Sequence, residues 1–262
     1  MSADARYRPT VYLFDIDGTL LGHDGRISAR NAAAIKAAAE HGVHVVLATA
    51  RLAANVRDVV AQLHSSVWVV AEMGATVLNP SSDLVHSVGL DAVMTRHITG
   101  FLDGRDCDYI VSLDGRNFVS SQSVEVRKGP VRTFSPAHLQ SNARVSRILV
   151  RRVDLADLTR IPHAASQIEL AETLDQSGAT EVAISPKGVS KLSGVDWVCT
   201  HLGIPLRRVL AIGDSAADIP MIQRVGVGVA VAHGDERLRE AADWVAPALD
   251  GVALALERFV FS

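Results

Sequence analysis

Short apolar runs along the chain stop abruptly at turn-forming or polar residues. The first run covers residues 11–14 and ends at Asp15. Runs of the same character cover 43–48, 67–70, 209–212 and 227–231. Because these runs are almost entirely apolar rather than alternating, they predict strands that are buried on both faces, as in a parallel sheet.

Segments with helical spacing alternate with the expected strands. Ser28 is placed to cap a helix over 29–40, and Gly42 is placed to end it. Val and Leu recur at helical spacing within 52–63. Further helices are expected over 193–202, 219–225, 236–242 and 252–259. This alternation predicts an α/β fold with a Rossmann-like parallel sheet and helices on both faces.

The pattern changes in the middle of the chain. Two expected strands flank Asp114-Gly115, a pair of residues that signals a hairpin. The expected strands are 108–113, 117–126, 147–152 and 181–185, and the expected helices are 90–102 and 162–177. Neighbouring strands with separate helices predict an α+β domain over 81–186, inserted into a core formed by 1–80 and 187–262.

Composition excludes several classes of protein. The chain has 262 residues, of which 48% are hydrophobic and 21% charged, and its net charge is −3, which is ordinary for a globular protein. We expect no nucleic-acid partner without a basic face, and no membrane span without an apolar run of about 20 residues. Residues 1–9 do not resemble a signal peptide, and two distant cysteines favour a reducing cytoplasm. The oligomeric state is left open.

Polar side chains follow three of the expected strands. They are Asp15 with Asp17, Thr49 with Arg51, and Asp214 with Asp218. In open parallel sheets, ligands bind outside the carboxyl ends of the strands, so these side chains are expected to meet. Two carboxylates about 4 Å apart repel by roughly 4 kcal/mol at an effective dielectric of 20. A bound cation would offset this repulsion, and oxygen ligands suit Mg²⁺. The alternative is that each aspartate only forms a turn or caps a helix.

The motifs and their order are similar to those of a known family. The segment 15–20, Asp-Ile-Asp-Gly-Thr-Leu after an apolar strand, resembles the first motif of the haloacid dehalogenase superfamily. Segment 47–51, Lys191 and segment 213–221 look like the second, third and fourth motifs of its Cof-like group. The long gap between the second and third motifs implies an α+β cap of the type IIB subgroup.

The resemblance implies a role for each matching residue. Asp15 would be the nucleophile that forms an aspartyl-phosphate, and Asp17 the general acid and base. Mg²⁺ would bind Asp15, the backbone carbonyl of Asp17, and Asp214. Gly18 would allow the tight turn that brings the loop to the phosphate.

Other matching positions would hold the phosphate. The resemblance assigns phosphate binding to Thr49, Ala50 and Lys191, and has Asp218 orient Lys191 or support the metal. Thr49 could instead cap a helix, and Lys187 is a second candidate for the lysine. Arg51 could face the phosphate or substrate, or only pair with a core acid.

Two positions depart from the family pattern, which usually has Asn where this chain has Ala217 and Met73. The nucleophile, the acid, the lysine and the metal carboxylate remain. We therefore expect a Mg²⁺-dependent phosphomonoester hydrolase that acts on a small phosphorylated metabolite, with a sugar phosphate as the favoured class. The alternatives are a phosphosugar mutase of the same superfamily and a metabolite-binding protein with little turnover.

Overall fold

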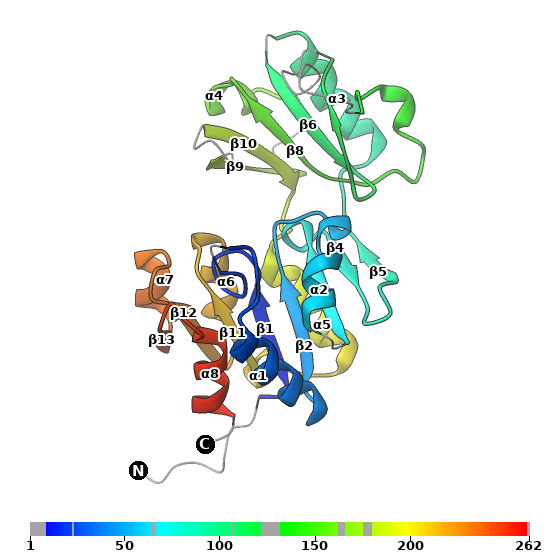
Figure 1. The fold of residues 1–262 in the computed structure, drawn as a ribbon. Coiled ribbons are helices and arrows are strands. Elements are labelled where there is room, and N and C mark those ends of the chain that lie inside the picture. The colour runs from blue at the N-terminus through cyan, green and yellow to red at the C-terminus, as the bar shows by residue number, and fades with distance from the viewer. Residues whose placement is uncertain are drawn as a thin grey trace. The chain divides into compact units, whose positions relative to one another are not determined.

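The computed structural model describes residues 9–22, 24–63, 66–105, 107–121, 132–161, 166–174 and 180–260. These residues fall into two compact units (Figure 1). The core unit lies within Met1–His86 and Ser190–Ser262, and the insertion unit lies within Ser87–Val189. The chain therefore leaves the core unit once and returns to it once.

The core unit is built on an eight-stranded sheet with the strand order β13-β12-β11-β1-β2-β3-β4-β5. The strands are β1 (Val11–Asp15), β2 (His44–Ala48), β3 (Val67–Ala71), β4 (Thr76–Leu78), β5 (Leu84–Ser87), β11 (Val209–Gly213), β12 (Val227–Val231) and β13 (Trp244–Ala246). From β13 to β3 every neighbouring pair is parallel, and β4 runs antiparallel to β3. The predicted parallel-sheet α/β fold is confirmed, and all five residues of β1 are buried, as its apolar run requires.

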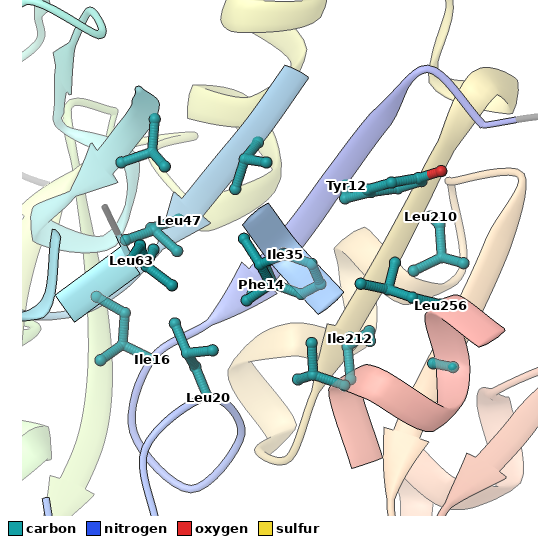
Figure 2. Packing of buried hydrophobic residues seen from close by; sticks show 14 of the residues in the cluster. Tyr12, Phe14, Ile16, Leu20, Ile35, Leu47, Leu63, Leu210, Ile212 and Leu256 are labelled. Carbon is teal, nitrogen blue, oxygen red and sulfur yellow. The ribbon is translucent and has the colours of Figure 1, made fainter. Parts of the chain in front are cut away.

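Helices cover both faces of this sheet. They are α1 (Ala29–Glu40), α2 (Arg57–Leu63), α5 (Lys191–Leu202), α6 (Ile219–Ile222), α7 (Glu236–Ala241) and α8 (Gly251–Phe259). Tyr12 and Phe14 of β1 pack on one face with Ile35 of α1 and Leu256 of α8 (Figure 2). Val11 and Leu13 of β1 point to the other face, where α5, α6 and α7 supply the apolar partners. Among the described residues, no helix has both the length and the apolar character that crossing a membrane would require.

Two helix predictions in the core unit show how local signals act. Helix α1 has the expected bounds, because the Ser28 side chain accepts a hydrogen bond from the Asn31 N–H and Gly42 follows the helix with φ +77°. The helix expected over 52–63 is interrupted. Its first part is a 3₁₀ turn, η1 (Ala53–Asn55), and α2 begins only at Arg57.

The insertion unit has a five-stranded sheet with the strand order β7-β6-β8-β10-β9, in which every neighbouring pair is antiparallel. The strands are β6 (Asp108–Leu113), β7 (Arg116–Val119), β8 (Val145–Arg151), β9 (Ile168–Leu174) and β10 (Thr180–Pro186), and the helices are α3 (Ala92–Asp103) and α4 (Leu155–Leu158). Asp114 and Gly115 form the expected hairpin turn, both with positive φ. The strand expected over 117–126 ends earlier, at Val119, and residues 122–126 lie outside the described residues.

The helix predicted over 162–177 is wrong. Residues 168–174 form strand β9, which pairs along its whole length with β10. Ile168 and Leu170 pack on the apolar cluster of the insertion unit, whereas Glu169 and Ala171, the residues that follow them, are exposed. Leu, Ala and Glu favour a helix, but pairing with β10 overrides that preference. Residues 162–165 and 175–177 of this prediction lie outside the described residues.

Candidate active site

Three neighbouring strands of the core sheet end beside one another. Strand β1 ends at Asp15, whose partner in β2 is Ala48, and β11 lies on the other side of β1. Thr49 directly follows β2, and Asp214 directly follows β11. Parallel strands present their carboxyl ends at the same edge, so these side chains share one edge of the sheet.

Lys191 lies buried between two carboxylates. Its Nζ donates to Asp15 Oδ1 at 2.5 Å and to Asp218 Oδ1 at 2.8 Å. The side chains of Lys191, Asp15 and Asp218 are exposed by only 4%, 5% and 0%. Burial alone would lower the pKa of Lys191, but attraction to the two carboxylates outweighs it and raises the pKa. The lysine is therefore held in its charged form.

The start of helix α5 fixes the position of Lys191. Lys191 is the first residue of α5, and Ser190 caps the helix by accepting a hydrogen bond from the Ser193 N–H at 3.2 Å. The Ser193 hydroxyl lies 3.0 Å from the Ser190 N–H and completes the reciprocal cap. Lys187, the second candidate for the lysine, is exposed in the insertion unit, so Lys191 is the lysine at Asp15.

Asp218 links this lysine to the loop that carries Asp214. Its Oδ2 accepts hydrogen bonds from the Asp214 N–H at 3.2 Å, the Ser215 N–H at 3.0 Å and the Ser215 hydroxyl at 2.9 Å. Its Oδ1 accepts from Lys191. Both oxygens of Asp218 already accept hydrogen bonds, so its geometry is that of a residue that orients Lys191 and the loop after β11.

The carboxylates at this edge fit a hard divalent cation. Asp15, Asp214 and Asp218 each offer one oxygen, and the three atoms lie within 4.8 Å of one another. An all-oxygen donor set of this kind suits Mg²⁺. Because the oxygens of Asp218 are engaged, Asp15 and Asp214 are the carboxylates best able to hold the ion. Burial raises the pKa of Asp15 against the opposing charge of Lys191, and a cation beside it would favour the ionised form.

Gly18 brings the loop after β1 against Asp214. It has φ +80°, and a Cβ at this position would overlap the Asp214 carboxylate. Thr19 Oγ1, one residue on, lies 3.2 Å from Asp214 Oδ1 and donates to it. Glycine is therefore required here both for its conformation and for the close approach of the two loops.

Asp17 and Arg51 form a second, exposed ion pair. Arg51 Nε lies 2.9 Å from Asp17 Oδ2, and Arg51 Nη2 lies 2.6 Å from Asp17 Oδ1. The Asp17 side chain is 58% exposed and that of Arg51 is 32% exposed. Arg51 therefore pairs with an acid in this structure, but Asp17 is an exposed acid rather than the core acid considered from the sequence.

Thr49 is held at the end of β2 by backbone contacts. Its N–H donates to the Val70 carbonyl at 2.9 Å, and its hydroxyl oxygen accepts from the Arg51 N–H at 3.1 Å. Thr49 is buried, and Ala50 beside it is exposed. The hydroxyl still has its own proton to donate, and Ala50 places a backbone N–H at the same strand end.

A turn with left-handed backbone supports both Thr49 and the start of α5. Glu72, Met73 and Gly74 have φ of +55°, +59° and +102°. The Met73 N–H donates to the Thr49 carbonyl at 3.0 Å. Gly74 packs so closely on the Ser190 carbonyl that a Cβ would overlap it. This turn therefore determines how close the loop after β2 comes to α5.

Sequence reasoning missed two contributors to this edge. The Glu72 side chain is buried and accepts from the Ala53 N–H at 3.3 Å, which ties the turn to η1. His233, which follows β12, places its Nε2 2.7 Å from the Gly18 carbonyl oxygen. Neither residue stands in one of the four recognised motifs. Ala217, where the family pattern has Asn, is exposed in the loop between Asp214 and Asp218.

Comparison with known proteins agrees with this geometry. Residues 12–256 match the family model of the haloacid dehalogenase-like hydrolases. A 5-amino-6-(5-phospho-D-ribitylamino)uracil phosphatase of Bacillus subtilis is 28% identical over 250 residues, which cover 94% of each chain. A phosphoglycolate phosphatase of Methanothermobacter thermautotrophicus is 27% identical over 249 residues, 94% of this chain and 96% of the relative.

Solved structures share the whole fold. A phosphatase of the same superfamily from Bacteroides thetaiotaomicron aligns with a TM-score of 0.83 and 22% identity, over 99% of this chain and 98% of that one. A subclass IIB sugar phosphatase aligns with a TM-score of 0.76 and 22% identity, over 95% of this chain and 98% of that one. The resemblance seen in the motifs is thereby confirmed, and the chain belongs to the haloacid dehalogenase-like hydrolase family.

Proposed function

We propose that this hydrolase is a Mg²⁺-dependent phosphomonoesterase that uses Asp15 as its nucleophile. The observation that carries the proposal is the placement of Asp15 at the end of β1, in contact with Lys191 and grouped with Asp214. A buried carboxylate that is aligned by a lysine and lies beside further carboxylates is the arrangement that an activated nucleophile needs.

The proposed reaction has two steps. In the first, a carboxylate oxygen of Asp15 forms a bond to phosphorus as the bond from phosphorus to the substrate oxygen breaks. Asp17, released from Arg51 and in its protonated form, gives its proton to that leaving oxygen. In the second, Asp17 takes a proton from water as the water oxygen attacks phosphorus. The bond to Asp15 breaks, inorganic phosphate leaves, and Asp15 and Asp17 return to their starting states.

Several groups of the chain would hold the phosphoryl oxygens during both steps. Lys191 offers a positive charge, Thr49 a hydroxyl proton and Ala50 a backbone N–H. When held by Asp15, Asp214 and the Asp17 carbonyl, Mg²⁺ would neutralise negative charge on the carboxylates and on the phosphate. Arg51 would keep Asp17 near the reacting oxygens until the substrate arrives.

A small phosphorylated metabolite is the proposed substrate, with a sugar phosphate favoured. The similar proteins support this class, since one relative is named for a phosphorylated ribityl compound and one similar fold is a sugar phosphatase.

We also propose a cytoplasmic location, because both cysteines, Cys107 and Cys199, are free and buried, as is usual in a reducing compartment.

Phosphate release by the purified protein tests this proposal. The panel contains sugar phosphates, phosphoglycolate and p-nitrophenyl phosphate, each with Mg²⁺ and with a chelator. We expect Mg²⁺-dependent release, reduced by at least about 10³-fold in Asp15→Asn because the nucleophile is lost. Asp24→Asn is the matched control, since Asp24 is an exposed aspartate of the same loop region. Release that survives in Asp15→Asn would show that Asp15 is not the nucleophile.

A further inference from the structure

The three residues 233–235, which follow β12, contact both loops that carry the proposed cation ligands. The Asp235 N–H donates to the Asp214 carbonyl at 2.7 Å. Gly234 packs on the backbone of Asp214, so closely that a Cβ would lie 2.5 Å from the Asp214 carbonyl oxygen. His233 reaches the other loop, with its Nε2 2.7 Å from the Gly18 carbonyl oxygen. One short segment therefore joins the loop after β1 to the loop after β11.

This segment is itself anchored in the core unit. The Ala232 N–H donates to the Ala246 carbonyl of β13 at 2.8 Å, and the Gly234 N–H donates to the Val231 carbonyl at 2.9 Å. The Asp235 side chain accepts from the Arg237 N–H at 2.8 Å and caps helix α7. Because its neighbours are hydrogen-bonded to the sheet edge and to α7, the backbone of His233 is held in place.

The His233 imidazole is the donor in its contact with the Gly18 carbonyl. A carbonyl oxygen can only accept, so Nε2 carries the proton and donates to Gly18. Gly18 has no side chain to restrict its backbone, and its left-handed conformation has to be held by its surroundings. The Gly18 carbonyl lies one peptide beyond the Asp17 carbonyl, which is a proposed ligand. Fixing the Gly18 carbonyl in place therefore limits how far the adjoining Asp17 carbonyl can move away from Asp214.

We infer that His233 is a positioning residue that sets the affinity of the site for its divalent cation. It does so by holding the Asp17–Gly18 backbone at a fixed place relative to Asp214. This inference rests on the proposed function, because it assumes that a cation binds between these loops. Partners that orient metal ligands from outside typically contribute 10- to 100-fold to metal affinity.

Two substitutions at this position separate the hydrogen bond from the bulk of the ring. His233→Leu fills a similar volume without a donor, and His233→Gln keeps an N–H donor at similar reach. His233 is exposed, so neither change opens a cavity in the core. His41→Leu is the matched control, because His41 is another exposed histidine whose Nδ1 lies 2.7 Å from a backbone carbonyl, at the end of α1.

Two measurements report the cation affinity. One is the Mg²⁺ concentration that gives half-maximal phosphate release at saturating substrate. The other is the rise in the unfolding midpoint as Mg²⁺ is added without substrate, which does not depend on turnover. In His233→Leu we expect about a 10-fold higher Mg²⁺ requirement in both, with the substrate KM at saturating Mg²⁺ within about twofold of the parent. In His233→Gln the requirement returns to within about twofold of the parent.

The outcomes distinguish this inference from the proposed function. If the parent protein responds to Mg²⁺ in both measurements and His233→Leu responds equally well, the positioning role is overturned and the proposed function stands. The same holds if His233→Gln is as impaired as His233→Leu, or if His41→Leu shows the same loss. If the parent protein neither binds Mg²⁺ nor releases phosphate, both the proposed function and the role of His233 are overturned.

Discussion

The buried ion pairs of Lys191 and the exposed ion pair of Arg51 differ in character. Lys191 is almost fully buried between Asp15 and Asp218, whereas Arg51 and Asp17 meet where water reaches both side chains. Charges removed from water interact strongly and depend on each other, and charges near water are screened and exchange partners readily. The proposed nucleophile is thus fixed before the substrate arrives, and the proposed acid is free to change its partner.

This difference matches what each carboxylate is proposed to do. A nucleophile gains from being preorganised, since its geometry determines how closely it approaches phosphorus. A general acid and base has to exchange protons with a leaving group and then with water. Burial on one side and exposure on the other allow one small site to meet both needs.

The largest effect on stability is expected from Asp218→Asn, which alters the buried ion pairs of Lys191. This change leaves Lys191 with one carboxylate and presents an amide to groups that now donate to a carboxylate. We expect the free energy of unfolding to fall by about 2–3 kcal/mol, because buried hydrogen bonds to a charged group are lost while Lys191 keeps Asp15. Urea unfolding measures it.

The control for this prediction is Asp157→Asn, which breaks the exposed pair between Asp157 and Arg160. We expect that change to cost less than about 1 kcal/mol. Equal losses in the two variants would mean that burial gives the Lys191 pair no special strength.

A medium effect is expected at the turn that supports the buried side. Met73 adopts a left-handed backbone at φ +59°, which asparagine tolerates better than methionine. Met73→Asn should therefore raise the free energy of unfolding by about 0.5–1 kcal/mol. Ser82→Asn, at an exposed left-handed position outside the site, is the matched control and should give a similar gain. A loss of stability in Met73→Asn alone would show that the methionine side chain stabilises the turn by more than its backbone strain costs.

The smallest effect is expected on the exposed side. Arg51→Gln should change the free energy of unfolding by less than about 1 kcal/mol, and less still at high salt. A double-mutant cycle with Asp17→Asn measures the coupling of the pair directly. A coupling above about 2 kcal/mol would remove the distinction between the two sides of the site.

The sequence predicted most of the core unit because its signals there are local. Each central strand contains a run of apolar residues, and Ser28 and Gly42 mark the ends of α1 without reference to the rest of the chain. The acidic residues of the site follow such strands directly, so their place at one sheet edge could be predicted. The grouping of Asp15, Asp214 and Asp218 agrees with that expectation.

Other features depend on partners that are distant in sequence. Strand β9 has helix-forming residues and is a strand because β10 pairs with it. Strands β4, β5 and β13 are only three or four residues long, too short to show a period. The contact of His233 with Gly18 arises from the way two loops approach each other, and no local pattern signals it.

The reciprocal cap at the start of α5 has a consequence for protein engineering. Ser190 is the first residue of the core unit after the insertion, and its cap with Ser193 sets where Lys191 begins the helix. The residues of this cap, which position Lys191, therefore all lie after the junction with the insertion unit. We expect that a recombination library that exchanges the residues between β5 and Ser190 would keep the same capped lysine in every member.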